Sequence, residues 1–213
     1  MRLLPFLLLT LLAGCGGTPK SANGQGDVLL VLGDSLSAGY GVSNPETNGW
    51  VALMETQMRQ EGFLTPSQTV VNASVSGETS AGGLERLSEL LETHEPETVV
   101  IELGANDALR RQSMSTLGSN LQQMVKMSQD TGAKVVLIGI DLPGLMSMIG
   151  GGQLDNTIDE AADQTKSWVV DYPLADVTDE GFMQEDRLHP TAQGQPMIKD
   201  ALMPTIKKAM AQP

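Results

Sequence analysis

Short apolar runs alternate with longer amphipathic segments along this chain, and that alternation restricts the possible folds more than any other feature. The apolar runs show no separation of polar from apolar positions, which is typical of strands buried on both faces. They cover residues 28–32, 69–73, 98–103, 134–140 and, more weakly, 168–170. Strands that alternate with helices in this way predict a parallel sheet with helices on both of its faces.

The segments between these runs space their apolar side chains for one face of a helix. Helices are predicted over residues 50–59, 81–91, 117–129 and about 190–210. The last of these contains Gly194, Pro196 and Pro204, which must fray or kink it. The polar segment 153–167 defines a helix before the fifth strand only poorly. With right-handed crossovers, the pattern predicts a flavodoxin-like three-layer α/β/α sandwich over residues 27–213, with a central sheet of about five strands.

The first residues are typical of an export signal. Arg2 precedes an apolar stretch, residues 3–12, that is shorter than the roughly 20 residues needed to span a bilayer. Two small residues then precede Cys15, and this run resembles the bacterial lipoprotein signal, in which the cysteine becomes the lipidated first residue. The alternative is an ordinary cleaved signal with an incidental cysteine. We expect a lipoprotein signal peptide over 1–14 and a lipidated, flexible tether over 15–26, which is rich in Gly, Ser, Pro and Asn.

The charge of the chain excludes some partners. The formal net charge is −13 at pH 7, and loss of Arg2 with the signal leaves −14. Nucleic acids and anionic lipid headgroups repel such a chain, so we expect no nucleic-acid partner and an acyl chain that holds the protein on the bilayer. A lipid-anchored monomer that faces the periplasm of a bacterial envelope is expected.

Cysteine and histidine are too scarce for most metal sites and for disulfides. Cys15 is the only cysteine, so an intrachain disulfide is excluded. The only two histidines, His94 and His189, lie far apart in the sequence, and no cluster of Cys, His and carboxylates has metal-ligand spacing. We therefore expect neither a metal nor a cofactor.

Polar side chains follow four of the predicted strands at the point where each strand ends. Asp34 and Ser35 follow the first, 74–79 the second, 104–107 the third and 186–190 the fifth. Because the carboxyl ends of parallel strands share one edge of a sheet, these segments are expected to meet in one cleft. A hydroxyl nucleophile, an acid–base pair and amide donors are what acyl transfer from an ester requires. The structural alternative for Asp34 and Ser35 is a strand-to-helix turn with a capping side chain.

The other candidates also have structural alternatives. Gly77 could serve only a turn, and Asp186 could be a surface acid. Asn106 and Asp107 belong to types that favour helix caps, and we assign Asp107 to that role and leave it out of catalysis. We interpret His94, between a leucine-rich helix and a proline, as a solvated loop residue.

Four stretches, 33–40, 71–80, 102–107 and 186–190, closely resemble the ordered sequence blocks of the SGNH (GDSL) hydrolases. The resemblance covers roughly residues 27–140 and 183–200 and is greatest to the periplasmic multifunctional thioesterase/lysophospholipase/arylesterase branch. Ser37 stands where the last glycine of a G-x-S-x-G elbow would be, which argues against an ordinary α/β-hydrolase.

The resemblance implies that Ser35 is the nucleophile and that His189 is the general base, oriented by Asp186. It also implies an oxyanion hole formed by the backbone N–H groups of Ser35 and Gly77 and the side-chain amide of Asn106. The implied activity is hydrolysis of carboxylic esters through an acyl-enzyme on Ser35, without a cofactor. Aryl and alkyl esters, lysophospholipids and acyl thioesters are the candidate substrates. An SGNH carbohydrate O-deacetylase and a non-catalytic envelope lipoprotein that binds acyl chains are the alternatives.

Residues 143–167 depart from the family pattern. Close relatives carry an aromatic and basic loop there, whereas residues 144–152 of this chain are rich in Gly and Met. Met146, Met148 and Ile149 could form an adaptable apolar wall for an acyl chain, but we favour a mobile loop. The departure affects the expected substrate preference more than the reaction type.

Overall fold

The structure is a computed structural model that describes residues 27–140, 152–173 and 181–212. The expected signal peptide, the tether with Cys15 and all but the last residue of the loop 144–152 lie outside the described residues.

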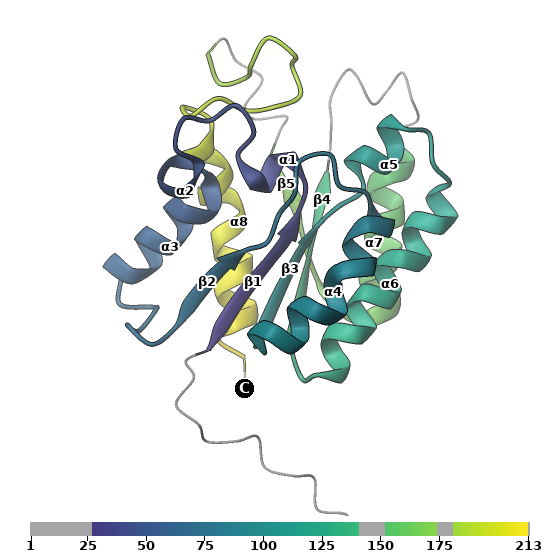
Figure 1. Cartoon of the computed structure of the whole chain (residues 1–213), viewed down its shortest axis with the longest axis horizontal. Coiled ribbons are helices and arrows are strands. Elements are labelled where there is room, and N and C mark those ends of the chain that lie inside the picture. The colour runs from purple at the N-terminus through teal and green to yellow at the C-terminus, as the bar shows by residue number, and fades with distance from the viewer. Residues whose placement is uncertain (1–26, 141–151, 174–180, 213) are drawn as a thin grey trace, which may run out of the picture.

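Five parallel strands form one sheet in the order β2-β1-β3-β4-β5 (Figure 1). They are β1 (Val28–Gly33), β2 (Thr69–Asn72), β3 (Thr98–Glu102), β4 (Lys134–Ile140) and β5 (Trp168–Tyr172). Every residue of β1 and β3 is buried, as expected for central strands covered on both faces. This strand order confirms the predicted flavodoxin-like sheet.

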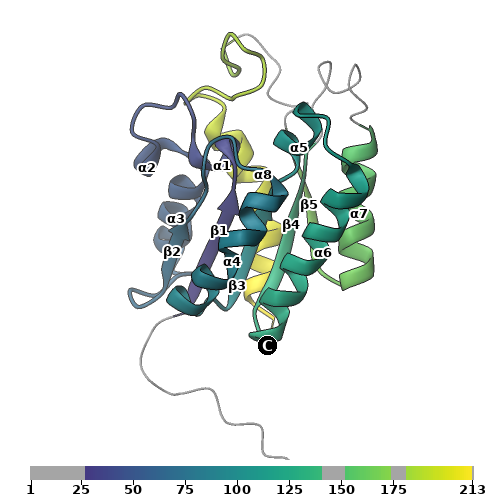
Figure 2. The ribbon, with the colours of Figure 1, turned by 45° about the vertical axis from the view of Figure 1, so that its right-hand side comes forward.

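Helices cover both faces of the sheet. They are α1 (Ser35–Ala38), α2 (Pro45–Asn48), α3 (Trp50–Gln60), α4 (Ser80–His94), α5 (Ala105–Leu109), α6 (Met114–Asp130), α7 (Gly152–Thr165) and α8 (Gln195–Met210). Helices α3 and α8 pack together on one face, while α4, α6 and α7 pack side by side on the other (Figure 2). The three-layer α/β/α sandwich is therefore confirmed.

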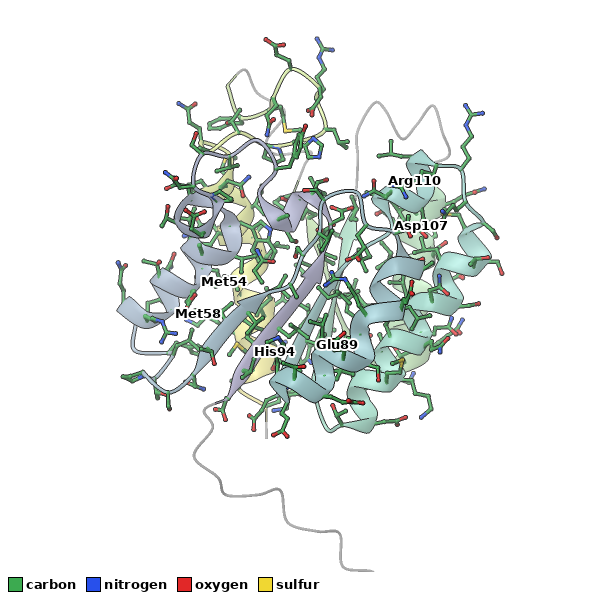
Figure 3. The ribbon with its side chains drawn as sticks, viewed as in Figure 1. Met54, Met58, Glu89, His94, Asp107 and Arg110 are labelled. Atoms are coloured by element: carbon green, nitrogen blue, oxygen red, sulfur yellow. The ribbon has the colours of Figure 1, made fainter. Side chains whose placement is uncertain are left out.

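The core consists mostly of aliphatic and methionine side chains, because only 3% of the residues are aromatic. Met54 and Met58, which Figure 3 labels on α3, are fully buried between that helix and the sheet. Trp50 and Tyr172 are the largest fully buried side chains of the described residues. Within those residues, no helix has both the length and the apolar character required to cross a bilayer.

The start predicted for the last helix was wrong. Helix α8 begins at Gln195, whereas Pro190 pairs with Met183 in an isolated antiparallel bridge. The Thr191 N–H donates to the Phe182 carbonyl at 2.8 Å, so the backbone on either side of Pro190 is extended and paired rather than helical. Pro196 instead occupies the first turn of the helix, where the missing N–H costs nothing.

Helix α7 is well formed although its sequence is polar. Its buried positions are Leu154, Ile158, Ala161 and Ala162, which recur at helical spacing. Two of these four side chains are alanines, so the buried apolar face of the helix is narrow. The polar composition of the segment as a whole therefore gives little sign of it.

Candidate active site

Ser35, His189 and Asp186 form a continuous hydrogen-bonded series at the carboxyl edge of the sheet. The Nε2 atom of His189 lies 2.8 Å from the Oγ atom of Ser35, and its Nδ1 atom lies 2.6 Å from Oδ2 of Asp186. This is the geometry in which an imidazole can take a proton from a hydroxyl while a carboxylate fixes its tautomer. The structure thus brings together the three residues that the sequence singled out as nucleophile, base and acid.

Asp186 and His189 lie on one hairpin-like segment, residues 182–191. The Gln184 N–H donates to the His189 carbonyl at 2.8 Å, and the Arg187 N–H closes the turn on the Gln184 carbonyl at 2.9 Å. The other carboxylate oxygen of Asp186, Oδ1, accepts from the backbone N–H groups of Leu188 (2.9 Å) and His189 (3.0 Å). These bonds fix the acid and the base relative to one another.

The charge of Asp186 follows from these bonds. Partial burial raises its pKa, but the hydrogen bonds from the backbone and imidazole of His189 and from the Leu188 N–H outweigh that effect and lower the pKa overall. The carboxyl group is therefore ionised at neutral pH, as a group that orients and stabilises an imidazolium must be.

Ser35 is the first residue of the short helix α1, directly after β1. The side chain of Asp34 caps this helix by accepting from the Leu36 N–H at 2.9 Å, which confirms the capping alternative for Asp34. Gly39 ends α1 in the left-handed region at φ 71°. The sharp change from strand to helix presents the half-buried Ser35 at the sheet edge.

Gly77 lies in the loop between β2 and α4, at φ 82°. Arg86 of α4 holds this loop by donating to the Ala73 carbonyl at 2.5 Å and by pairing with the carboxylate of Glu78. On the outer side, the Arg110 guanidinium donates to the Gly77 carbonyl at 2.7 Å.

Asn106 lies in the first turn of α5, and its Nδ2 donates to Oδ2 of Asp34 at 2.8 Å. The cap assignment of Asp107 was wrong, because Gly104 is the N-cap of α5 and Asp107 lies buried within the helix. Asp107 accepts instead from the backbone N–H of Ser80 at 2.8 Å and from its hydroxyl at 2.6 Å, which ties α5 to the start of α4.

One cleft of about 240 Å³ joins all of these segments. Ser35, Gly77, Asn106 and His189 all line it, so the three side chains and the two backbone N–H groups that are expected to act together share one cavity. Asp34 and Ser76 also line the cleft, and the remaining residues of its wall are mostly apolar: Leu36, Tyr40, Ala105, Leu109 and Leu188.

The second histidine does not belong to this site. His94 is the last residue of α4 rather than a loop residue, and Figure 3 shows it at the opposite end of the sheet from Arg110. Within residues 27–140, 152–173 and 181–212, no group of three or more His, Cys, Asp or Glu side chains could hold a metal ion.

Three residues of the site escaped the sequence reasoning. The Tyr40 ring lies 4.7 Å from the His189 ring, centroid to centroid, and the side-chain amide of Gln184 donates to the Tyr40 and Pro190 carbonyls at 2.7 and 3.0 Å. Glu102, the last residue of β3, lies fully buried beneath Asp34. A carboxylate at the end of a strand of apolar residues was the only signal in the sequence that could have revealed Glu102.

Comparison with known proteins yields a consistent group of relatives. A family model described as the GDSL-like lipase/acylhydrolase family matches residues 31–196. Esterase TesA of Pseudomonas aeruginosa is 41% identical over 180 residues, which cover 84% of this chain and 87% of that protein. A protein of Escherichia coli named thioesterase 1/protease 1/lysophospholipase L1 is 36% identical over 203 residues, covering 92% of this chain and 88% of the other.

A solved structure has the same fold. The psychrotrophic esterase EstA from a Pseudoalteromonas species, crystallised with the inhibitor monoethylphosphonate, superposes with a TM-score of 0.78 at 35% sequence identity. The match covers 87% of this chain and all of that one.

Proposed function

Since this chain belongs to the GDSL-like lipase/acylhydrolase family and is an ester hydrolase of the SGNH type, we propose that it cleaves carboxylic esters through an acyl-enzyme on Ser35. The observation that carries this proposal is the position of the His189 ring, with Ser35 at 2.8 Å on one side and Asp186 at 2.6 Å on the other. A serine hydroxyl is a weak nucleophile until a base removes its proton, and this ring is within reach to do so.

In the first half of the reaction, Oγ of Ser35 attacks the ester carbonyl and its proton passes to Nε2 of His189. The tetrahedral intermediate then collapses, and the imidazolium returns that proton to the departing alkoxide or thiolate. In the second half, His189 takes a proton from water as the water oxygen attacks the acyl carbonyl, and a second tetrahedral intermediate forms. When that intermediate collapses, the bond between the acyl carbon and Oγ of Ser35 breaks, the imidazolium returns the proton to Oγ, and the carboxylic acid is released. Asp186 stabilises the imidazolium in both halves without taking up a proton itself.

The oxyanion of each tetrahedral intermediate requires preorganised donors, each contributing roughly 3 kcal/mol to the lowering of the barrier. We assign this role to the backbone N–H groups of Ser35 and Gly77 and to the Nδ2 group of Asn106. All three residues line the cleft that contains the Ser35 hydroxyl.

The wall of the cleft supports acyl or aryl groups as the part of the substrate that is recognised. Leu36, Leu109 and Leu188 offer apolar surface next to Ser35. Alkyl and aryl esters, lysophospholipids and acyl thioesters all have an apolar portion that fits such a wall. This surface favours them over the acetylated sugars of a carbohydrate O-deacetylase, and the aligned Ser35–His189–Asp186 series argues against a non-catalytic binding protein.

The experiment compares wild-type protein with Ser35→Ala and His189→Ala on a series of nitrophenyl esters of increasing acyl length, with acyl thioesters, a lysophospholipid and acetylated xylan alongside. Both variants should lose ester turnover and keep the wild-type circular dichroism spectrum. Ser88→Ala, at an exposed position on α4, is the matched control and should retain full activity. Undiminished hydrolysis by Ser35→Ala would reject the assignment, and a preference for acetylated xylan would favour the deacetylase.

The proposed location is the periplasmic side of a bacterial membrane, with Cys15 carrying the lipid anchor and the hydrolase domain acting as a monomer. The run of residues 12–15 and the apolar stretch before it support this proposal.

A further inference from the structure

Two carboxyl groups lie buried directly beneath the cleft. Asp34 and Glu102 are each 0% exposed, and Oε2 of Glu102 accepts from the Asp34 N–H at 3.3 Å and from the Ser37 hydroxyl at 2.8 Å. Their approach depends on Gly33, which pairs with Glu102 in the β1–β3 register. A Cβ atom at position 33 would lie 2.7 Å from Cβ of Ser37 and 2.8 Å from Oε2 of Glu102, so a larger residue would displace one of these side chains.

The carboxylate of Asp34 makes two directed contacts. Its Oδ1 accepts from the Leu36 N–H at 2.9 Å, and its Oδ2 accepts from Nδ2 of Asn106 at 2.8 Å. A carboxylate only accepts hydrogen bonds, so the amide of Asn106 must present its nitrogen rather than its oxygen to Asp34. The amide nitrogen carries two hydrogens, and the one that Asp34 does not use is left for the oxyanion.

Burial and mutual repulsion both act on the charges of the two carboxyl groups. Burial raises the pKa of Asp34 to about 6, and the hydrogen bonds from Leu36 and Asn106 and the charge of His189 limit that rise. Burial and the neighbouring charge of Asp34 raise the pKa of Glu102 well above its ordinary value. The other titratable group that faces the pair is Tyr172 of β5, whose own pKa is raised by burial and by both carboxyl groups. The repulsion between the two carboxyl groups thus opposes the presence of a charge on both at once.

We propose that Asp34 is a positioning residue of the hydrolysis, which acts through the Asn106 amide by holding its N–H groups at the oxyanion. The inference rests on the proposed function, because it assumes the roles given there to Ser35 and Asn106. Glu102 assists by accepting a hydrogen bond from the backbone N–H of Asp34 at 3.3 Å, which helps to hold Asp34 at the end of β1.

The substitution Asp34→Asn isolates this role. The new amide can still cap α1 through its oxygen, but its nitrogen then meets the nitrogen of Asn106, and two donors cannot pair. Asn106 must turn its oxygen toward position 34 or move away, and in either case the oxyanion loses a fixed donor. Because this donor acts on the transition state, kcat should fall about 10- to 100-fold while KM stays within about threefold.

A double-mutant cycle between Asp34→Asn and Asn106→Ala tests the proposal. Asn106→Ala alone should lower kcat about 100- to 1,000-fold, as loss of one oxyanion donor does elsewhere. If Asp34 acts through Asn106, adding Asp34→Asn to that variant should lower kcat by no more than about threefold further. A further 10- to 100-fold loss in the double variant would show that Asp34 acts independently of Asn106 and would overturn the proposal.

Asp107→Asn provides the matched cycle, because Asp107 is also buried and lies next to Asn106 in α5 but hydrogen-bonds to Ser80. Its effect on kcat should be the same with or without Asn106→Ala. Melting temperatures and circular dichroism establish that each variant folds. If Asp34→Asn does not fold, Asp34→Ser replaces it in the cycle, since serine still caps a helix but is too short to reach Asn106.

Failure of the proposed function would be visible separately. If Ser35 is not the nucleophile, Ser35→Ala remains active, whatever the cycle shows. If Ser35→Ala is inactive and the cycle is additive, the hydrolase mechanism stands and only the role of Asp34 is rejected.

Discussion

Two aspartates of the site show how local contacts set the charge of a single residue. Asp34 is fully buried, and that burial raises its pKa to about 6. The side chain of Asp186 is 42% exposed. Its partial burial raises its pKa, but the hydrogen bonds from His189 and Leu188 outweigh that effect and lower the pKa overall. Asp186 is therefore a permanent anion at neutral pH, whereas the charge on Asp34 is lost below about pH 6.

The raised pKa of Asp34 predicts a pH-dependent stability. Between the ordinary value of 3.8 and about 6, the folded protein binds more protons at this site than the unfolded chain does, so stability falls as the pH rises. The stabilisation is complete below pH 3.8 and is lost as the pH rises through 6. Between pH 4.5 and pH 7, the melting temperature of the wild-type protein should therefore fall by a few degrees more than that of Asp34→Asn. The conversion is that about 1 kcal/mol corresponds to roughly 2–4 °C in a chain of this size.

Thermal unfolding of both proteins at several pH values between 4.5 and 8 provides the measurement, with urea unfolding at the two ends of the range to confirm the sign. A stability difference between the two proteins that stays constant over this range, or that shifts in favour of the wild type as the pH rises, would contradict a raised pKa at Asp34.

The sequence predicted some of these residues and not others for a definite reason. Asp186 and His189 are three residues apart, so one turn of chain joins them and local spacing was enough to pair them. Asp34 and Glu102 are 68 residues apart, and they meet only because β1 and β3 pair Gly33 with Glu102. A strand register of that kind cannot be read from one sequence, and the buried pair beneath the nucleophile was therefore missed.

At the scale of elements, the side chain of Gln184 joins the segment 182–191 to the chain just after helix α1, in addition to the hydrogen bond between His189 and Ser35. The Gln184 amide donates to the Tyr40 carbonyl after α1 and to the Pro190 carbonyl beside His189. Gln184→Ala should loosen the alignment of His189 with Ser35 and lower kcat about 10-fold with little change in KM, because a displacement of about 1 Å in a catalytic group is costly. Steady-state kinetics on a short nitrophenyl ester would measure this change.

Glu185→Ala is the matched control for that substitution, since Glu185 is an exposed neighbour in the same segment. It should keep the wild-type kcat. If Gln184→Ala also keeps it, the two hydrogen bonds of Gln184 contribute nothing to catalysis.

Helix α4 offers two adjacent glycines in opposite environments. A methyl group at Gly83 would collide with Cδ1 of Leu103 in the core, whereas one at Gly82 would only contact the side chain of Glu78 at 3.4 Å. Gly83→Ala should lower the free energy of unfolding by about 1–3 kcal/mol through overpacking. Gly82→Ala should raise it by up to about 1 kcal/mol, because alanine favours the helix.

Urea unfolding of the two variants would measure both free energies on the same helix. The opposite signs are the important result, because they separate helix propensity from packing. Equal stabilisation by both substitutions would mean that α4 can move away from Leu103 without cost.

The elements that the sequence misjudged share a physical cause. Helix α7 buries only Leu154, Ile158, Ala161 and Ala162, and a stripe with two alanines is a weak periodic signal. Pro190 resembles a helix start in isolation, but its neighbours are paired with residues 182–184. The His189 carbonyl accepts from the Gln184 N–H, the Thr191 N–H donates to the Phe182 carbonyl, and the Pro190 carbonyl accepts from the Gln184 side chain. Tertiary contacts outweighed local preference in both places, whereas the long apolar runs of the central strands needed no such context.

At the scale of the whole molecule, the predicted tether and the active site adjoin opposite ends of β1. Val28 begins the strand at one edge of the sheet, and Ser35 follows its end at the other (Figure 1). Six residues of strand separate these edges by about 20 Å. The predicted tether therefore joins the domain at the edge of the sheet away from the cleft, and we expect the proposed anchor and the active site to work independently of one another.

Cys15→Ser tests that independence together with the proposed lipidation. The variant should move from the membrane fraction to the soluble periplasmic fraction, because one signal for lipid attachment is removed and the net charge of the chain repels anionic headgroups. On a soluble short-chain nitrophenyl ester, its kcat/KM should stay within about twofold of the wild type, since the cleft lies at the far edge of the sheet. Membrane fractionation and assays on equal amounts of detergent-solubilised protein provide the two measurements, with Ser21→Ala in the same predicted tether as the control. Retention of Cys15→Ser in the membrane would exclude lipidation as the anchor, and a large loss of activity on the soluble ester would show that the tether contributes to the active site.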